Sequence, residues 1–225
     1  MASRPAAGGG RWVTVPHERL GGWIAGFAGR HGPFEGAYDA MLVRLLAADG
    51  ALAEVEVPFP PLAGAPGQPA QEVVAELVRH VAVERRVGVL LVRLGGHAAG
   101  VFQGSRLVSS KVGTRQVHGR SAAGGWSQQR FARRRDNQVT AALGSAADVA
   151  VRVLLAGPLD AVVLGGERTA AEAVLADRRL APLRPLVTGR LLDVPDPRLT
   201  VLQAAPWRHV WIRVVDPDRD AGGSA

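Results

Sequence analysis

Residues 87–112, VGVLLVRLGGHAAGVFQGSRLVSSKV, contain three short apolar runs that glycines separate from one another. The first run is dense in Val and Leu, which favours a buried strand. A Gly-Gly pair leads from it into the second run, and Gly104 leads into the third. Glycine-containing turns between β-prone runs are typical of hairpins. We therefore predict an antiparallel meander with strands over 87–94, 98–103 and 107–112.

The chain after this meander alternates between helix and strand patterns. Apolar residues recur at spacings of three and four from Val139 to Val153, which predicts a long amphipathic helix. We expect a second helix over 169–177, and strands over 161–164, 186–194 and 209–215. Alternating strands and helices favour an α/β architecture, so we predict a layered mixed sheet with flanking helices.

The residues before the meander are less regular. Asp49-Gly50 between two apolar runs is a strong hairpin signal. Proline and glycine predict a loop over 58–69. We expect strands over 12–16, 37–47 and 51–57, and helices over 17–30 and 71–83. A single domain over 11–215 accounts for these elements, with 11–84 as an alternative N-terminal subdomain, and we expect disorder in 1–10 and 216–225.

The composition excludes several classes of protein. The 225 residues are 47% hydrophobic and 21% charged, which is typical of a globular chain. No cysteine is present, so disulfides and thiolate metal sites are excluded. The longest apolar stretch, 141–166, is interrupted by three charged residues, and 1–10 has no apolar signal region. We expect a cytoplasmic protein without a membrane segment or a cofactor.

The positive charge of the chain is concentrated in one segment. The formal net charge is +7, and 26 of the 27 basic residues are arginine. Residues 106–135 hold eight basic side chains and no acidic one, whereas the rest of the chain holds 19 basic and 20 acidic residues. Such a local excess indicates a polyanionic partner, most plausibly a nucleic acid.

This basic segment combines a glycine-containing loop with the start of the long helix. Gly124 and Gly125 allow the backbone to approach a ligand closely. Ser127 is a suitable helix cap, which places Gln128 and Gln129 in the first turn, where backbone N–H groups attract anions. The arginines that follow are suited to gripping phosphates. The RNA-binding residues that we predict are Lys111, Arg115, Arg120, Trp126, Arg130, Arg133, Arg134 and Arg135.

The string from Gly124 to Arg135, GGWSQQRFARRR, resembles the release-factor-like peptidyl-tRNA hydrolases of ribosome quality control. These include a bacterial branch made of this domain alone and are related to the catalytic domain of eukaryotic and archaeal class I release factors. The strings SKVG at 110–113 and VLGG at 163–166 are similar to that group as well. The resemblance covers about 85–215, and its specific motif lies within 111–137.

The resemblance implies a ribonuclease-H-like topology and a loop that enters the peptidyl-transferase centre of the large ribosomal subunit. It implies that Gln128 is the functional glutamine. Trp126 and Ser127 stand between the Gly-Gly pair and Gln128, so Gln129 remains an alternative. The partners that it implies are the ribosome, its RNA and peptidyl-tRNA. We expect a monomer.

The implied reaction is hydrolysis of the ester between a nascent chain and the 3′ end of its tRNA. Backbone N–H groups near Ser127 are suited to stabilising the oxyanion, and Gln128 to positioning water. The catalytic set that we predict is Gly124, Gly125, Ser127, Gln128 and Gln129, without a metal. Two alternatives remain open: a nuclease acting on the tRNA 3′ end, and a noncatalytic RNA-binding module. Glu54 and Glu56 share a strand face as a nuclease carboxylate pair would, but no third acidic residue accompanies them and a solvated strand face explains them better.

Overall fold

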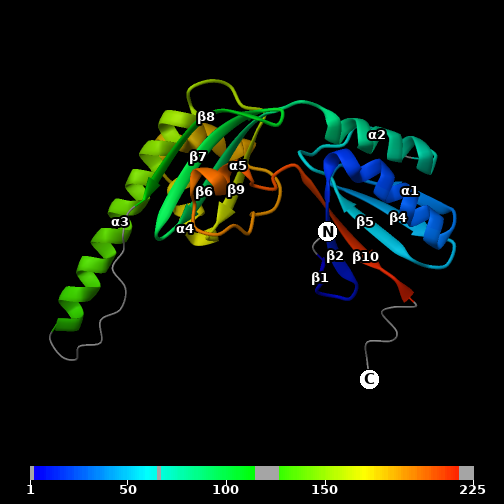
Figure 1. Ribbon diagram of the computed structural model, residues 1–225, viewed down its shortest axis with the longest axis horizontal. Helices are drawn as coiled ribbons and strands as arrows, with labels where there is room; N and C mark the ends of the chain where they lie inside the picture. The colour runs from blue at the N-terminus through cyan, green and yellow to red at the C-terminus, as the bar shows by residue number, and fades with distance from the viewer. Residues whose placement is uncertain (1–2, 65–66, 115–126, 218–225) are drawn as a thin grey trace. The chain divides into compact units, whose positions relative to one another are not determined.

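The computed structural model describes residues 3–64, 67–114 and 127–217. The chain forms two compact units (Figure 1): residues 1–83 together with 208–225 make unit 1, and residues 84–207 make unit 2. The chain thus begins in unit 1, passes through unit 2 and returns to unit 1 for its last strand. The single domain over 11–215, with 11–84 as an alternative N-terminal subdomain, stays a prediction. Unit 1 differs from that alternative because it also includes residues 208–225.

Unit 1 is built on one six-stranded antiparallel sheet with the strand order β1-β2-β10-β5-β4-β3. The predicted hairpin at Asp49-Gly50 is confirmed, and Gly50 has a φ of 87°. The strands are β1 (Ser3–Pro5), β2 (Arg11–Pro16), β3 (Phe34–Tyr38), β4 (Leu42–Ala47), β5 (Leu52–Glu56) and β10 (His209–Val215).

The predicted last strand exists, but it belongs to the sheet of unit 1 and not to the layered sheet of the second half. β10 lies between β2 and β5 and is antiparallel to both. Its side chains alternate, with Val210, Ile212 and Val214 buried and the residues between them half-buried. This alternation suits an antiparallel sheet that is covered on one face.

Two helices cover one face of this sheet, as Figure 1 shows. A 3₁₀ turn, η1 (His17–Arg19), leads into α1 (Leu20–His31), and α2 (Ala70–Ala82) follows the loop after β5. Leu20, Ile24 and Phe27 of α1 are buried in the same core as residues of α2 and the inward side chains of the strands. The predicted helices are therefore confirmed, because their apolar stripes face the sheet.

Two strands of unit 1 differ from the sequence prediction. Ser3–Pro5 form β1 within the stretch 1–10, because they pair with β2 and the guanidinium of Arg4 lies 4.7 Å from the ring centre of Trp211. The predicted strand 37–47 is two strands, β3 and β4, joined by a turn in which the carboxylate of Asp39 accepts hydrogen bonds from the backbone N–H groups of Met41 and Leu42.

Unit 2 contains a four-stranded mixed sheet with the order β8-β7-β6-β9. The predicted antiparallel meander is confirmed by the pairs β6–β7 and β7–β8. β9 adds to β6 in parallel, after the long helix has crossed the sheet. The strands are β6 (Arg86–Arg93), β7 (Gly96–Gln103), β8 (Arg106–Thr114) and β9 (Ala161–Gly166).

Helices lie on both faces of this sheet. Buried residues of α3, α4 and the 3₁₀ helix η2 share one core with Ala99 and Val101 of β7. On the opposite face Leu202 of α5 lies against Gly100, and the ring centres of Phe102 and Trp207 are 5.2 Å apart. The helices are α3 (Ser127–Leu154), α4 (Arg168–Leu175), η2 (Arg178–Leu186) and α5 (Leu199–Gln203).

The prediction of a strand over 186–194 is wrong. Pro182 and Pro185 lie in η2, which extends to Leu186. The residues after it make only two isolated parallel bridges to β9, at Val187 and Leu192. Gly189, which lies between these bridges, has a φ of 76° and interrupts the extended backbone, so this segment follows β9 without forming a continuous ladder.

The predicted fold class is confirmed: the chain is a mixed α/β protein with two sheets and flanking helices. The ribonuclease-H-like topology stays a prediction. None of the helices in the described part of the chain combines the length and apolarity that a membrane span needs.

The central position of β10 makes a prediction about stability. Ile212 is fully buried between α1, α2 and the sheet, so Ile212→Ala leaves a cavity and lowers the free energy of unfolding by about 2–5 kcal/mol. Leu46 on β4 of the same sheet is 50% exposed, and Leu46→Ala is the control that changes it by less than about 0.5 kcal/mol. Urea unfolding followed by tryptophan fluorescence measures both, and equal effects would contradict the central packing of β10.

Candidate functional site: the basic loop and its supports

β8, the strand that precedes the basic loop in the sequence, ends at one edge of the sheet of unit 2. β6 runs parallel to β9 and antiparallel to β7, and β7 runs antiparallel to β8. The carboxyl ends of β6, β8 and β9 therefore lie at the same edge. In open α/β sheets ligands bind outside the carboxyl ends of strands. The predicted loop follows β8 at this edge.

A buried histidine supports the last residues of β8. His97 on β7 pairs with Gly113, and its side chain is 4% exposed. A Cβ atom placed on Gly113 would lie 2.3 Å from Nε2 of His97, so only glycine leaves room for the ring. Burial lowers the pKa of His97, which keeps the imidazole neutral. Among the described residues, Nε2 of His97 has no hydrogen-bond partner.

Among the described side chains of α3, those that are buried lie in its carboxyl-terminal half. Ala146, Ala147, Ala150, Val153 and Leu154 are buried against the sheet, whereas 136–138 are exposed. Figure 1 shows the first turns of α3 running past the sheet and away from the rest of unit 2. From Ser127 to Ala146 the helix rises by about 28 Å. Unit 2 thus presents the amino-terminal end of α3 well beyond its core.

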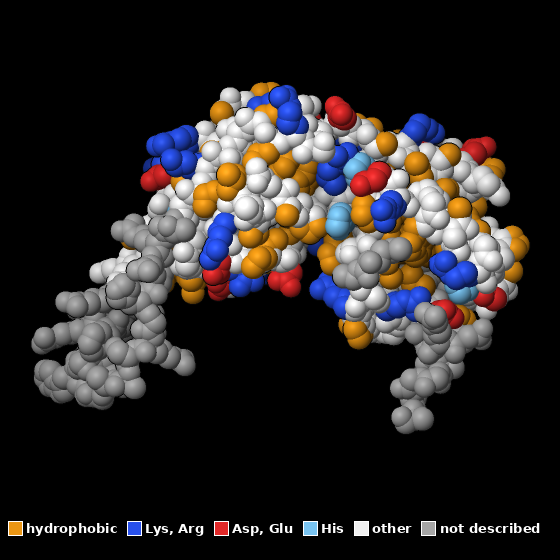
Figure 2. Space-filling view, viewed as in Figure 1, with side chains coloured by type: hydrophobic (Ala, Val, Ile, Leu, Met, Phe, Trp, Pro, Cys, Tyr) orange, Lys and Arg blue, Asp and Glu red, His pale blue; other side chains and the backbone are white. Residues whose placement is uncertain are grey.

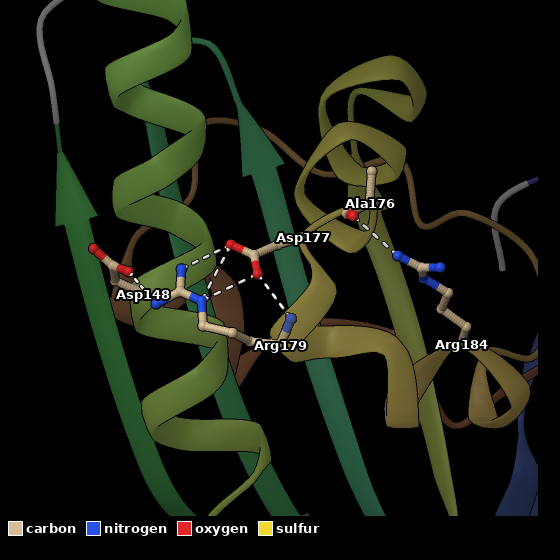
Figure 3. Close-up of polar contacts among 5 residues, drawn as sticks. All are labelled: Asp148, Ala176, Asp177, Arg179 and Arg184. Atoms are coloured by element: carbon tan, nitrogen blue, oxygen red, sulfur yellow. Dashed lines mark hydrogen bonds and ion pairs between the residues drawn. The ribbon is translucent and has the colours of Figure 1, made fainter.

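Ion pairs hold the anchored half of α3 to the segment after α4 (Figure 3). The guanidinium of Arg179 reaches Asp148 of α3 at 2.8 Å and Asp177 at 2.7 Å. The carboxylate of Asp177 also accepts a hydrogen bond from the backbone N–H of Arg179, which caps η2. Arg184 donates to the carbonyl oxygens of Leu175 and Ala176 at the end of α4. These contacts connect η2 with α3 and α4.

The structure places the predicted site residues in three groups. Lys111 is exposed on β8, three residues before the strand ends. α3 begins at Ser127, so Gln128 and Gln129 lie in its first turn, as predicted, and the helix continues through Arg130, Arg133, Arg134 and Arg135. The other predicted residues lie outside the described residues: Arg115, Arg120, Gly124, Gly125 and Trp126.

The start of α3 is an electropositive helix end. Its first turn contains no acidic residue, and the N–H groups of that turn have no acceptor within the helix. On the face of the molecule shown in Figure 2, by contrast, basic and acidic side chains are interspersed over the coloured residues. An anion such as phosphate or an oxyanion is therefore the ligand that the end of α3 favours.

Other groups considered from the sequence do not form a second centre. Both oxygens of Glu54 accept hydrogen bonds from arginine, 2.9 Å from Nη1 of Arg213 and 3.2 Å from Nε of Arg44. Glu54 is therefore explained by its ion pairs with the two arginines on the sheet surface, without a catalytic role. Within the ranges 3–64, 67–114 and 127–217, no three His, Asp or Glu side chains are grouped closely enough to hold a metal ion.

Comparison with known families identifies the chain. Residues 85–215 match the family described as Actinobacteria/chloroflexi VLRF1 release factor. The chain belongs to this release factor family. The match begins at the start of β6 and ends with β10, so it contains the predicted loop, α3 and their supports. The VLRF1 match makes the chain a release-factor-like protein.

Three solved structures are similar to parts of this chain at low sequence identity. Archaeal translation termination factor aRF1 is 16% identical with a TM-score of 0.40, over 73% of this chain and 46% of that one. The Vms1 mitochondrial localization core is 9% identical with a TM-score of 0.39, over 74% and 72%. Archaeoglobus fulgidus Pelota is 13% identical with a TM-score of 0.31, over 90% and 63%. The chain thus covers less than half of the aRF1 chain, and no curated protein matches it in sequence.

The contact between His97 and Gly113 is the support of the site that the sequence did not predict, although Gly113 lies in the SKVG string. Gly113→Ala brings a methyl group onto the imidazole, and we expect it to lower the free energy of unfolding by about 1–3 kcal/mol. His97→Ala removes the obstacle, so the double variant should lose less than the sum of the two single changes. Urea unfolding of the four proteins measures this coupling, and additive effects would show that the two residues do not contact each other.

Asp177 makes the anchoring of η2 sensitive to acid. Hydrogen bonds from Arg179 lower the pKa of Asp177 from 3.8 to about 2. A carboxyl group with a lowered pKa stabilises the fold fully above its unfolded pKa, and this contribution is lost as the pH falls from about 4 to about 2. Asp177→Asn keeps an acceptor for the cap but cannot ionise. We expect the wild type to lose more stability than this variant across that interval, measured by urea unfolding; equal losses would exclude Asp177 as the cause.

Proposed function

We propose that the chain hydrolyses the ester that joins a nascent peptide to the 3′ end of tRNA, on large ribosomal subunits that carry stalled peptidyl-tRNA. The observation that carries this proposal is the projecting amino-terminal end of α3 in a chain of a release factor family. The loop that precedes it holds the Gly-Gly pair, and its first turn holds Gln128 and Gln129.

Reach is the first requirement of this function. The peptidyl-transferase centre is a narrow, RNA-lined cavity, so a catalytic loop has to enter it ahead of the domain that carries it. A helix that rises by about 28 Å between its first residue and its buried half supplies such a carrier. The basic residues along the same segment favour entry into a cavity lined by phosphates.

Ester hydrolysis then needs a placed water molecule and donors for the developing oxyanion. Free backbone N–H groups in the first turn of α3 are the donors in our proposal. The amide of Gln128 positions the water, with Gln129 as the alternative. A neutral amide holds water without altering the local charge, and the terminal ribose hydroxyl of the tRNA or a ribosomal group takes the proton.

The remaining predicted residues bind RNA in this proposal. Lys111 on β8 and the arginines of α3 flank the loop on its two sides. Arginine forms bidentate hydrogen bonds with phosphate oxygens. Binding of ribosomal RNA on both sides of the loop would hold it in one orientation during the reaction. The proposed partners are the large subunit, its RNA and peptidyl-tRNA, and the proposed active form is a monomer.

Peptide release tests the role of the glutamines. Gln128→Ala should slow release from large subunits or ribosomes bearing peptidyl-tRNA by about 100-fold or more, because the water loses its position. Gln138→Ala is the matched control, since this glutamine is exposed on the same helix ten residues further on. If Gln129→Ala causes the loss instead, Gln129 is the functional residue.

The released tRNA distinguishes the proposal from its alternatives. An intact CCA end indicates ester hydrolysis, whereas a shortened end indicates a nuclease and contradicts the proposal. A noncatalytic RNA-binding module would be shown by release that neither glutamine change affects, together with weaker ribosome binding and a flatter salt dependence in Arg133→Ala/Arg134→Ala.

A further inference from the structure

A groove runs along α1 in unit 1, outside the residues that match the release factor family. Its volume is about 550 Å³, within the range of sites that hold small ligands or parts of larger ones. Val15 of β2 closes one side. The other lining residues come from η1 and α1: Glu18, Arg19, Gly22, Trp23, Gly26 and Arg30.

The helical spacing of these residues arranges them in a line. Arg19, Trp23, Gly26 and Arg30 follow one another at intervals of three and four, so they share one face of the helix. The two arginines are eleven positions apart, which corresponds to about 16 Å along the axis. Trp23 lies between them, and its ring stacks on Phe27 with 5.8 Å between ring centres and 13° between planes. The groove thus has a cationic side chain at each end and a fixed aromatic ring between them.

The two glycines of the groove have no packing role that the structure explains. A Cβ atom on Gly22 would meet nothing within 4 Å, and one on Gly26 would meet only the tip of Arg30 at 3.4 Å. Alanine would fit at both positions and favour the helix more than glycine does. Glycine at these positions keeps the floor of the groove low and open beside Trp23.

The charges of the groove favour an anion. Among the residues that the structure describes, no carboxylate pairs with Arg19 or Arg30, and neither side chain makes a hydrogen bond. Glu18 is the one acidic lining residue, and its carboxylate contacts Nδ1 of His17 at 2.7 Å. Two guanidinium groups therefore stand against one carboxylate that already has a partner.

We propose that this groove binds single-stranded RNA, with one base against Trp23 and backbone phosphates on Arg19 and Arg30. Aromatic side chains between cationic ones are the usual platform for unpaired nucleotides, because every base has a face to stack and every linkage carries a charge. An acidic peptide would satisfy the two arginines but has no planar group for Trp23. The site is a second RNA contact, on a different unit from the loop, and it does not require the loop to be catalytic.

A direct test uses the full chain and a fluorescein-labelled oligo(A) of about ten nucleotides. Ultraviolet cross-linking followed by trypsin digestion should attach RNA to the peptide 20–30, which holds Trp23 and is released by cleavage after Arg19 and Arg30. Fluorescence anisotropy at several salt concentrations gives the affinity. Neither readout involves peptidyl-tRNA, so a failure here is distinguishable from a failure of the hydrolysis that we propose for the loop.

Variants of the groove make the test quantitative. Arg19→Ala/Arg30→Ala should weaken binding about tenfold and reduce the slope of log affinity against log salt by about 1.4, the value for two phosphate contacts on a single strand. Arg178→Ala/Arg198→Ala removes the same charge from exposed positions of unit 2 and should change neither. Glu18→Gln should strengthen binding, because it removes the one negative charge of the groove.

Gly22→Leu tests the shape of the groove without changing its charge. Leucine is a better helix former than glycine, and its Cβ enters open space, so the urea midpoint should hold while the affinity for oligo(A) falls. Unchanged affinity in both Gly22→Leu and Arg19→Ala/Arg30→Ala, or no RNA on the peptide 20–30, would overturn the proposal. Loss of oligo-glutamate binding but not of oligo(A) binding in these variants would overturn it as well and identify an acidic peptide as the ligand.

Discussion

Close packing of small residues fixes α3 on the sheet, and the position of the candidate site depends on that packing. Ala146, Ala147 and Ala150 are buried at this interface beside Ala99 and Val101 of β7. Small side chains on both surfaces let the helix lie close to the strands, and interior packing leaves little freedom to shift. The ion pair between Arg179 and Asp148 adds a lateral contact at the same height of the helix. The opposite half of α3 projects beyond the sheet (Figure 1), so Ser127 at its start lies away from the core.

The path of the chain links this arrangement to unit 1. The family match ends with β10, yet β10 is a central strand of a sheet whose other five strands come from the first 83 residues. A strand with neighbours on both sides exposes hydrogen-bonding groups along both edges if those neighbours are lost. β10, the last segment of the family match, therefore needs the strands before residue 85 as its pairing partners. The groove on α1, where we propose that RNA binds, lies on the surface of this same unit.

Local patterns predicted most of this fold, and the failures have physical causes. The meander β6–β8, the helix α3 and the hairpin at Gly50 carry strong periodicity or turn chemistry, and each is confirmed. β1 has three residues and no pattern, because its stability comes from pairing with β2 and from the contact of Arg4 with Trp211. The predicted strand over 186–194 was wrong because its apolar residues do not form a continuous strand. Leu186 ends η2, and Val187 and Leu192 make isolated bridges to β9.

The sequence also predicted where the helix next to the candidate site begins, but not the buried contact that supports the end of β8. Ser127 as the start of a helix followed from cap chemistry, which is local. The contact between His97 and Gly113 joins residues sixteen positions apart on paired strands, and nothing in either neighbourhood marks it. Likewise, the spacing of Arg19, Trp23 and Arg30 is visible in the sequence, but Val15 of β2, which closes the groove beside them, comes from another element.

Charge distribution explains why the basic segment is best placed at the end of a projecting helix. Eight basic residues without an acidic neighbour repel one another, and the repulsion would grow if they were packed into a medium of lower dielectric constant than water. Solvent and salt screen such charges when they are exposed. A partner that supplies phosphates would screen these charges further. Binding such a partner would therefore reduce the repulsion among the eight basic residues that is present in the free chain.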